Sequence, residues 1–304
     1  MKQEEPILVA IHCLVYNHEP YLRDCFEGFV MQKTNFRFVA IAHDDCSTDG
    51  SAAIIREYEA KYPEIFRPIY EIENQYSKHD GSLGRIMNTA IDATGAKYIA
   101  MCEGDDYWTD PYKLQKQVDW MDTHSNFIAC FHNAVVDSGN GNKRLFNNLN
   151  ENHYPTTEDI IERPWFISTQ TLLYRNIHLV YSEWMWNVKN GDYLLELLLA
   201  KVGKFYYMDD VMSVYRIHPE GLSQKMEKNL VPFYDGMIFL LSHMKEYYRG
   251  VCAESFDIAI SKYKKLRKDE YRNSKYPWLK YFNWRFYKRN LFKMLRITRT
   301  KRDI

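Results

Sequence analysis

The sequence predicts an α/β fold, a Rossmann-like mixed sheet flanked by helices, and three observations support this prediction. Apolar runs of strand length alternate with amphipathic segments, the links between them are short, and acidic residues follow two of the apolar runs. Strand, helix and strand in succession predict right-handed units with parallel strands. The 304 residues are enough to bury a full core, as one large domain or as a domain with an extension.

The first third of the chain contains the most regular alternation. Four apolar runs have the length of buried strands, and they cover residues 7–11, 36–42, 65–70 and 98–101. Three segments place apolar residues on one helical face, and they cover residues 21–32, 51–62 and 82–94. We therefore expect alternating strands and helices that lead to a central strand at 98–101.

The remainder of the chain predicts a less regular second part. We expect a capped helix start at 156–159, helices at 111–125 and 191–202, and a pair of helices within 225–271. We expect strands at 127–136, 205–209 and 211–215, and a loop rich in Gly and Asn at 138–150. Trp165 is either a core aromatic residue or a platform for a sugar ring, and both interpretations stay open.

Composition and short motifs exclude several classes of protein. The six cysteines form no CxxC pair and no Cys/His spacing, which disfavours a disulfide framework and a zinc site. No signal peptide and no run of about 18 apolar residues is visible, so we expect a cytoplasmic protein. Neither GxGxxG nor GxxxxGK(S/T) follows the first strand, which excludes the glycine cradles of dinucleotide-binding and P-loop proteins.

Charge is distributed unevenly along a chain whose net charge is zero. Residues 272–304 hold eleven Lys or Arg and one acid, so the body of the protein is acidic and its tail is basic. The tail also interleaves aromatic residues with cations, which is typical of a helix lying in a membrane interface. A helix that packs on the rest of the protein is the alternative. Nucleic acid is a weaker candidate partner, because no recognised binding motif accompanies the charge.

Carboxylates follow two of the predicted strands. Glu103-Gly104-Asp105-Asp106 comes directly after the strand at 98–101, and Asp44-Asp45 follows the strand at 36–42. Ligands bind at the carboxyl ends of strands in open α/β sheets. A single acidic turn would be interpreted as solvated, but two turns at one rim predict a Mg²⁺ or Mn²⁺ site, since hard cations take oxygen ligands and substrate phosphates.

These segments, taken in order, resemble a known family. Tyr16-Asn17 follows the first strand, Asp44-Asp45-x-Ser47-Thr48-Asp49-Gly50 follows the second, and Glu103-Gly104-Asp105-Asp106-Tyr107-Trp108 follows the central strand. Over about residues 6–220 the chain is similar to the inverting family 2 glycosyltransferases of the GT-A fold. The resemblance implies a nucleotide-diphospho-sugar transferase fold and a nucleotide-sugar donor, usually a UDP-sugar, bound with Mn²⁺ or Mg²⁺.

The resemblance also implies roles for individual residues. The donor-binding residues would be Tyr16, Asp44, Asp45, Arg85, Asn88 and Asp105, with Tyr16 and Asp45 at the base and Asp105 at the ribose. The metal would be held by Asp106, with Glu103 and His218 as further contacts. Two departures stand out, because Cys13-Leu14 replaces the family's Pro-Thr and Glu103 replaces the first acid of its D-x-D-D pattern.

Asp192 is the candidate catalytic residue. It follows Gly191 at the start of a predicted helix, where an Asp ordinarily acts as a cap. The resemblance instead implies a general base that takes the proton of an acceptor hydroxyl during a single, inverting displacement. Such a displacement needs no nucleophilic side chain, and the sequence contains no convincing one.

The prediction for the whole chain is a metal-dependent inverting glycosyltransferase. Residues 1–224 would form the catalytic domain, with a nucleotide-sugar half at about 1–110, an acceptor half at about 111–224, and a helical extension at 225–304. The acceptor would be a hydroxyl of a glycan or lipid-linked saccharide, which suits surface polysaccharide assembly and a place at the inner face of the membrane. The alternatives are an inactive sugar- or nucleotide-binding protein of the same fold and a sugar nucleotidyltransferase.

Overall fold

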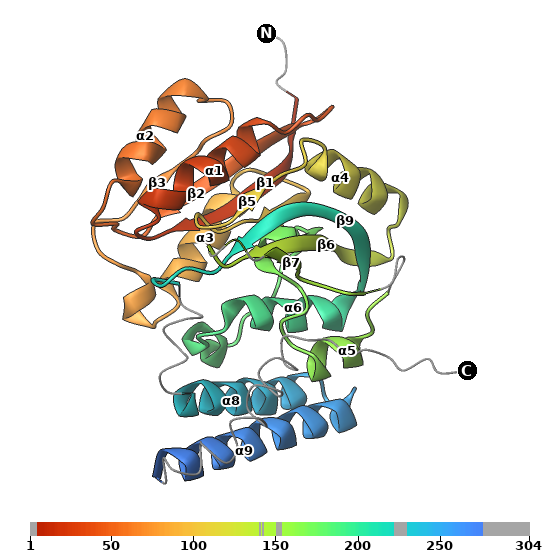
Figure 1. The fold of residues 1–304 in the computed structure, drawn as a ribbon. Coiled ribbons are helices and arrows are strands. Elements are labelled where there is room, and N and C mark those ends of the chain that lie inside the picture. Colours follow the sequence, from red (N-terminus) through yellow and green to blue (C-terminus); the bar gives the residue numbers. More distant parts are fainter. Residues whose placement is uncertain (1–4, 140, 142, 150–153, 222–229, 276–304) are drawn as a thin grey trace.

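A computed structural model describes residues 5–139, 141, 143–149, 154–221 and 230–275. A single nine-stranded mixed sheet has helices on both faces, and a helical hairpin forms a further layer below (Figure 1). Strand order is β3-β2-β1-β4-β8-β6-β9-β5, and β7 pairs with β6. The predicted α/β fold with a mixed sheet and a helical C-terminal part is confirmed.

The first third of the chain forms the parallel part of the sheet. Its strands are β1 (Ile7–Val15), β2 (Arg37–Asp44), β3 (Ile69–Tyr70) and β4 (Tyr98–Met101). Its helices are α1 (Glu19–Val30), α2 (Ser51–Lys61) and α3 (Ser82–Asp92), with the short 3₁₀ helix η1 (Tyr76–Lys78) before α3. Strand β1 pairs in parallel with β2 and β4. The strand expected at 65–70 is shorter, and Phe66 makes only an isolated bridge to Ala40.

The second part of the chain adds antiparallel pairs. Its strands are β5 (Tyr107–Trp108), β6 (Phe127–Asp137), β7 (Lys143–Leu145), β8 (Leu173–Arg175) and β9 (Lys204–Arg216). Its helices are α4 (Lys113–Thr123), α5 (Thr157–Glu162), α6 (Gly191–Val202), η2 (Thr169–Thr171) and η3 (Glu183–Asn187). Strand β8 pairs antiparallel with β4 and joins the two parts of the sheet.

Two expectations about this second part were wrong. The strands expected at 205–209 and 211–215 are one long strand, β9, because the pairing with β6 continues past a register shift between Met208 and Val211. The segment expected as a loop at 138–150 contains β7, which pairs with the end of β6. The predicted capped helix start is present, since Thr156 and Asp159 form a reciprocal capping box at α5.

Two hydrophobic layers, one on each face of the sheet, form the core. One lies under α1, α2 and α4 and includes Phe26, Phe29 and Trp108. The other lies under α3, α5, α6 and the hairpin. Trp165 packs beside this second layer, with ring centroids 5.8 Å from Tyr193 and 6.1 Å from the hairpin residue Phe233. The structure therefore places Trp165 among aromatic side chains of the protein, which is the core alternative.

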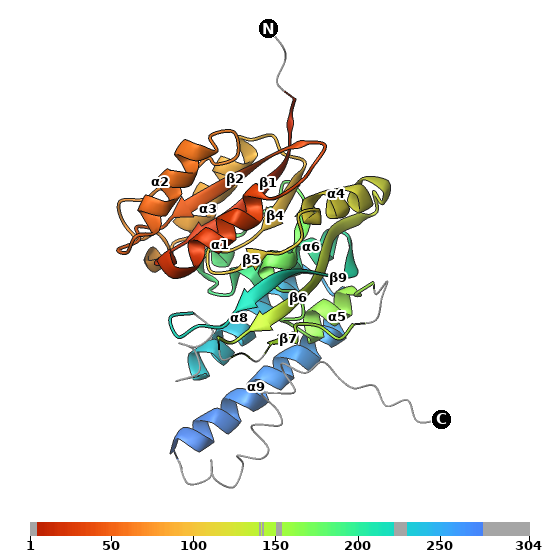
Figure 2. The same ribbon diagram turned by 45° about the horizontal axis from the view of Figure 1, so that its top comes forward.

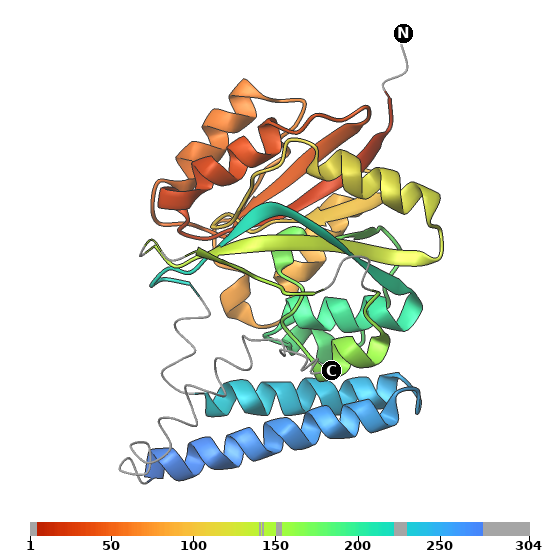
Figure 3. The same ribbon diagram turned by 45° about the vertical axis from the view of Figure 1, so that its right-hand side comes forward.

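The hairpin consists of α8 (Val231–Tyr247) and α9 (Ala253–Lys275). Helix α8 packs against α6, and the Tyr248 hydroxyl donates to the Leu197 carbonyl at 2.6 Å. The C-terminal end of α9 extends beyond the sheet and its flanking helices (Figure 2), and it lies at the same end of the molecule as the C-terminal end of β9 (Figure 3). No helix within the described residues is long and apolar enough to cross a membrane. The basic tail at 276–304 lies outside the described residues.

Candidate active site

The carboxyl ends of β1, β2 and β4 meet at one rim of the sheet. The Asp45 N–H donates to the Val15 carbonyl at 2.9 Å, and the Gly104 N–H donates to the Leu14 carbonyl at 3.0 Å. Val15 is also paired with Asp44 across the β1–β2 ladder. These main-chain bonds bring the two acidic turns to the end of β1, as the strand pattern predicted.

Residues of the acidic turn after β2 hold the loop that follows β1. Asn17 adopts a left-handed φ of 57°, and its N–H donates to the Ser47 hydroxyl at 3.0 Å. The Glu19 N–H, at the start of α1, donates to Asp49 at 3.0 Å. The polar run after β2 therefore shapes the neighbouring loop, and it leaves Tyr16 46% exposed at the rim.

The acidic turn after β4 is packed tightly against the first loop. A Cβ at Gly104 would lie 2.8 Å from Nδ1 of His18, so any other residue there would push the turn away from α1. At the other end of the turn, the buried Trp108 donates its indole N–H to the Gln170 carbonyl at 2.9 Å. The turn is therefore held at both ends.

The two adjacent aspartates of this turn face different partners. Asp105 Oδ2 lies 3.0 Å from Nε2 of His218 and 3.8 Å from Nε2 of His18. Asp106 is 2% exposed, and its Oδ1 accepts the main-chain N–H of Arg216 at 2.7 Å. Asp106 thus anchors the end of β9. The structure brings His218 to Asp105, whereas the sequence interpretation grouped it with Asp106.

The charges of two carboxylates, Asp105 and Asp192, act on a third, Glu103. Burial, followed by the charges of Asp105 and Asp192, raises the pKa of Glu103 to about 8. Burial also raises the pKa of Asp192, at the first turn of α6. Burial works against ionisation of Asp105, yet the hydrogen bond from His218 and the charge of His18 keep its pKa below the ordinary value. The hydrogen bond to Asp105 in turn raises the pKa of His218.

This charge distribution fits a divalent cation. Among the residues that the structure describes, no group of three or more His, Cys, Asp or Glu side chains has the arrangement of a metal site. Asp105 and His218 supply two ligand atoms 3.0 Å apart, and Glu103 adds an uncompensated carboxyl nearby. Mg²⁺ and related cations often take only one or two protein ligands and complete their shell with substrate phosphates and water. The residues present are therefore compatible with the implied metal.

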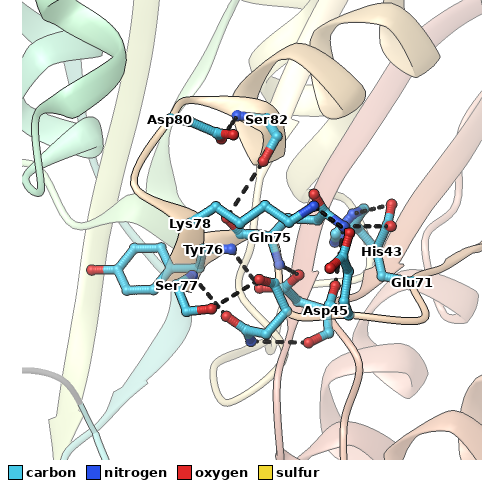
Figure 4. Close-up of polar contacts among 11 residues, drawn as sticks. His43, Asp45, Glu71, Gln75, Tyr76, Ser77, Lys78, Asp80 and Ser82 are labelled. Carbon is cyan, nitrogen blue, oxygen red and sulfur yellow. Dashed lines mark hydrogen bonds and ion pairs between the residues drawn. The ribbon is translucent and has the colours of Figure 1, made fainter.

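Asp45, expected at the base pocket, is 4% exposed and holds a neighbouring loop (Figure 4). Its two carboxylate oxygens accept the main-chain N–H groups of Gln75 at 2.6 Å and Tyr76 at 3.0 Å. Its own carbonyl accepts the Asn74 side-chain amide at 3.0 Å. Each carboxylate oxygen still has a second lone pair for a ligand donor.

The other predicted donor-binding residues have diverse surroundings. Asp44 is buried, and its carboxylate accepts a main-chain N–H of its own turn at 3.2 Å. The Arg85 guanidinium lies 4.9 Å from the centre of the Trp186 ring. Asn88, on the same helix, lies beside Tyr181. The Arg85 guanidinium also donates to the Asp80 carbonyl. The described contacts of Arg85 and Asn88 are thus with the loop before α3 and with the segment around η3, and not with the carboxylates of the acidic turn.

Tyr76 is a site residue that sequence reasoning missed. Its main-chain N–H donates to the Asp45 carboxylate at 3.0 Å, and burial, followed by the charges of Asp192 and Glu103, raises the pKa of its hydroxyl. The residue lies in the loop before α3, a segment without a motif that marks it. Its only sequence signal is a bulky aromatic residue within a polar loop that leads to a site helix.

Comparison with known proteins agrees with this geometry. The model of the family described as Glycosyl transferase family 2 matches residues 11–187, which is more than half of the chain. The chain therefore belongs to glycosyl transferase family 2, and it is a glycosyltransferase with the GT-A fold.

Three individual proteins illustrate how similar this chain is to known sequences and structures. An uncharacterized protein of Mycobacterium tuberculosis is 34% identical over 249 residues, which cover 80% of this chain and 69% of the relative. S. aureus TarS in complex with UDP-GlcNAc has a TM-score of 0.59 at 16% identity, over 84% of this chain and 73% of that chain. The Pyrobaculum calidifontis mannosyltransferase PcManGT, in complex with GDP-Man and Mn²⁺, has a TM-score of 0.52 at 12% identity, over 86% and 77% of the two chains. At such low identity the two structures show the fold alone.

Proposed function

We propose that this glycosyltransferase transfers a sugar from a UDP-sugar to a hydroxyl of a glycan or lipid-linked saccharide, with inversion and with a divalent metal. The observation that carries the proposal is that Glu103 and Asp105, in the turn after β4, lie near Asp192 in the first turn of α6, so that the charges of Asp105 and Asp192 both raise the pKa of Glu103. Neighbouring carboxylates repel one another, and a cation together with a polar ligand offsets that repulsion. A nucleotide diphosphate with its metal supplies both.

Asp192 is proposed as the general base. Its raised pKa makes the carboxylate a better proton acceptor than an exposed Asp, and it removes the proton of the acceptor hydroxyl as that oxygen attacks the anomeric carbon. A single attack opposite the leaving diphosphate inverts the configuration. Its Oδ1 also accepts the N–H of Tyr193 at 2.8 Å, in the first turn of α6, so the same carboxylate satisfies an N–H group that has no partner within the helix. The two roles do not exclude each other.

Asp105 and His218 are proposed to hold the metal, with Glu103 beside them. This assignment revises the role first given to Asp106, because Asp106 is buried against the main chain of β9. When bound, the metal would neutralise charge on the leaving diphosphate. His218 reaches the turn from the segment after β9, and its ring lies 4.5 Å from that of Tyr21 on α1, which fixes its orientation.

The nucleotide is proposed to lie over the ends of β1 and β2, beside Tyr16, Asp44 and Asp45. TarS was solved with UDP-GlcNAc and PcManGT with GDP-Man and Mn²⁺, which supports a nucleotide-sugar as the donor class. UDP is the nucleotide we propose, because the family that the chain resembles usually takes a UDP-sugar as donor.

A thermal-shift panel tests this proposal. UDP, GDP, CMP and dTDP are each added with and without Mn²⁺, and a ligand that binds the folded state raises the melting temperature. We expect a shift for UDP that requires Mn²⁺. A shift for another nucleotide would retain the mechanism and replace the donor. No shift for any nucleotide would favour an inactive protein of this fold.

An anionic membrane surface is proposed as a further partner, through the hairpin and the basic tail. A groove of about 670 Å³ between α8 and α9 is lined by Val231, Ile238 and Tyr271 and by the exposed cations Lys264 and Lys268. Apolar and basic residues together suit an interface with anionic lipid headgroups. The first turns of α8 and the last turns of α9, which line this groove, lie at the end of the molecule toward which the arrow of β9 points (Figure 3).

Vesicle co-sedimentation tests this contact. The full chain is mixed with vesicles of phosphatidylcholine alone or with phosphatidylglycerol added, at low and high salt. We expect binding only with phosphatidylglycerol, weakened by salt and by the double change Lys264→Glu, Lys268→Glu. Equal binding by wild type and variant would exclude the groove.

A further inference from the structure

The last residues of β9 lie beside the acidic turn after β4, and strand pairing fixes their main chain. Val214 is paired with Tyr107, which directly follows Asp106. Arg216 is paired with Asp137 at the end of β6, and its own N–H donates to Asp106 at 2.7 Å. Because strands on both sides hold this main chain, the side chain of Arg216 starts from a fixed position beside the turn.

The side chain of Arg216 joins the acidic turn to helix α1. One guanidinium nitrogen, Nη1, donates to the Asp105 carbonyl at 3.0 Å, and the other, Nη2, forms an ion pair with the carboxylate of Asp24 on α1. The Arg216 side chain is 16% exposed, whereas that of Asp24 is 62% exposed. A guanidinium presents its donors as a rigid fork, so bonds to two different groups fix its orientation. A surface residue of α1 is thus connected, through Arg216, to the main chain of the turn.

Two tyrosine rings also lie beside the guanidinium of Arg216. Its central carbon is 4.2 Å from the centre of the Tyr107 ring and 5.4 Å from that of Tyr21. Such cation–π contacts are attractive, and more so where water is excluded. Tyr21 precedes Asp24 by three residues, so both lie on one face of α1. The Tyr21 ring also lies against that of His218, and α1 therefore contacts both ends of the segment 216–218.

The two residues proposed to hold the metal both rest on these contacts. The main chain of Asp105 accepts a bond from Arg216, and His218 follows Arg216 by two residues. Asp105 Oδ2 and His218 Nε2 lie 3.0 Å apart. A divalent cation takes its ligands within a narrow range of about 2.0–2.6 Å, so a small shift of the turn or of the segment after β9 would spoil the pair. Residues that orient metal ligands change metal affinity by about 10–100-fold when they are replaced.

We propose that Arg216 and Asp24 are positioning residues for metal binding. Asp24 orients the guanidinium of Arg216, and Arg216 holds the acidic turn against the segment that carries His218. This inference rests on the proposed function. Neither residue touches the metal, since each acts through Asp105 and His218. An exposed Asp on a helix is ordinarily replaced with little effect, so an influence of Asp24 on metal binding is specific to this arrangement.

The test measures UDP binding to the full chain by calorimetry, once with Mn²⁺ in excess and once with EDTA. The ratio of the two dissociation constants isolates the contribution of the metal. We expect this ratio to fall by about tenfold in Arg216→Met and by about threefold in Asp24→Ala, with UDP affinity in EDTA unchanged. The loss is smaller in Asp24→Ala because Arg216 keeps its bond to the Asp105 carbonyl.

Glu57→Ala is the matched control for Asp24→Ala. Glu57 is a similarly exposed carboxylate (53%), and it pairs at 2.7 Å with Arg23, the neighbour of Asp24 on α1. The ratio in this variant should match the wild type. Melting curves are recorded for every variant, and exposed Asp24 can be replaced without loss of the fold even if Arg216→Met is destabilised.

A double-mutant cycle tests whether Asp24 acts through Arg216. In the double variant the ratio should fall little further than in Arg216→Met, whereas an additive loss of about thirtyfold would refute the coupling. An unchanged ratio in Asp24→Ala would overturn the role of Asp24. Equal weakening of UDP with Mn²⁺ and with EDTA in Arg216→Met would indicate direct contact with the diphosphate and overturn the positioning role. Wild-type binding of UDP that is absent, or that Mn²⁺ does not strengthen, would refute the proposed function itself.

Discussion

A comparison of the variants Asp105→Asn and Asp106→Asn distinguishes the roles of the two adjacent aspartates in the acidic turn after β4. Asp105 is partnered by His218 at 3.0 Å and faces the proposed metal, so its neutralisation removes a charged ligand and the partner of His218. We expect turnover to fall at least about a hundredfold, the usual scale for a group that acts on the reacting centre. The Mn²⁺ concentration needed for half-maximal activity should rise as well.

Asp106→Asn should have a much smaller effect on the chemistry. Asn retains an oxygen that can accept the Arg216 N–H, now 2.7 Å from Asp106 Oδ1, and it fits the same buried space. The expected cost is about 1 kcal/mol of unfolding free energy, with a melting temperature lower by about 2–4 °C. Turnover should change by less than about tenfold.

The assay is steady-state transfer at several Mn²⁺ concentrations, with melting curves recorded for both variants. A larger loss and a higher Mn²⁺ requirement in Asp106→Asn than in Asp105→Asn would refute this reasoning. That outcome would restore the metal role that the sequence interpretation gave to Asp106. Similar hundredfold losses in both variants, with normal melting curves, would mean that both carboxylates contact the metal.

Two further predictions concern Asp192 and Lys113. Asp192→Asn should lower kcat at least about a hundredfold and abolish the acidic limb of the wild-type pH profile. In the wild type, activity should fall as pH drops through the pKa of Asp192, which lies above the ordinary 3.8, because only the ionised carboxylate accepts a proton. An acidic limb of the pH profile that is unchanged in Asp192→Asn would exclude Asp192 as the base. Burial lowers the pKa of Lys113 from 10.5 to about 7, so between these values the unfolded state binds more protons and wild-type stability rises with pH. Between pH 7 and pH 9, the free energy of unfolding measured in urea should rise by about 2 kcal/mol more for the wild type than for Lys113→Met. The same pH dependence in both proteins would contradict this prediction.

The order of strands and helices in the first third of the chain was predictable because local patterns and neighbouring pairing agree there. Strands β1, β2 and β4 are consecutive apolar runs joined by helices, and such units permit essentially one handedness. The second part was predicted less well. Strand β9 continues through Asp209 and Asp210 because β6 pairs along its length, and this partner begins about 80 residues earlier. Pairing with the end of β6 also forms β7 in a segment whose composition indicated a loop.

Local sequence was sufficient to find the acidic turns, because the carboxyl ends of parallel strands must share a rim. It was not sufficient to assign roles within a turn. Asp105 and Asp106 are adjacent in sequence, and only partners more than a hundred residues later, His218 and Arg216, distinguish the residue facing the site from the buried one.

The sequence by itself determined the α/β class, the family resemblance and the place of the site, since these follow from periodicity, short connections and the residues at strand ends. The tertiary structure alone decided that Asp45 anchors the loop before α3, through the main-chain N–H groups of Gln75 and Tyr76. The physical reason is that a carboxylate takes whichever donors the fold brings to it. Those donors come from main chain 30 residues away, which carries no sequence signal of its own.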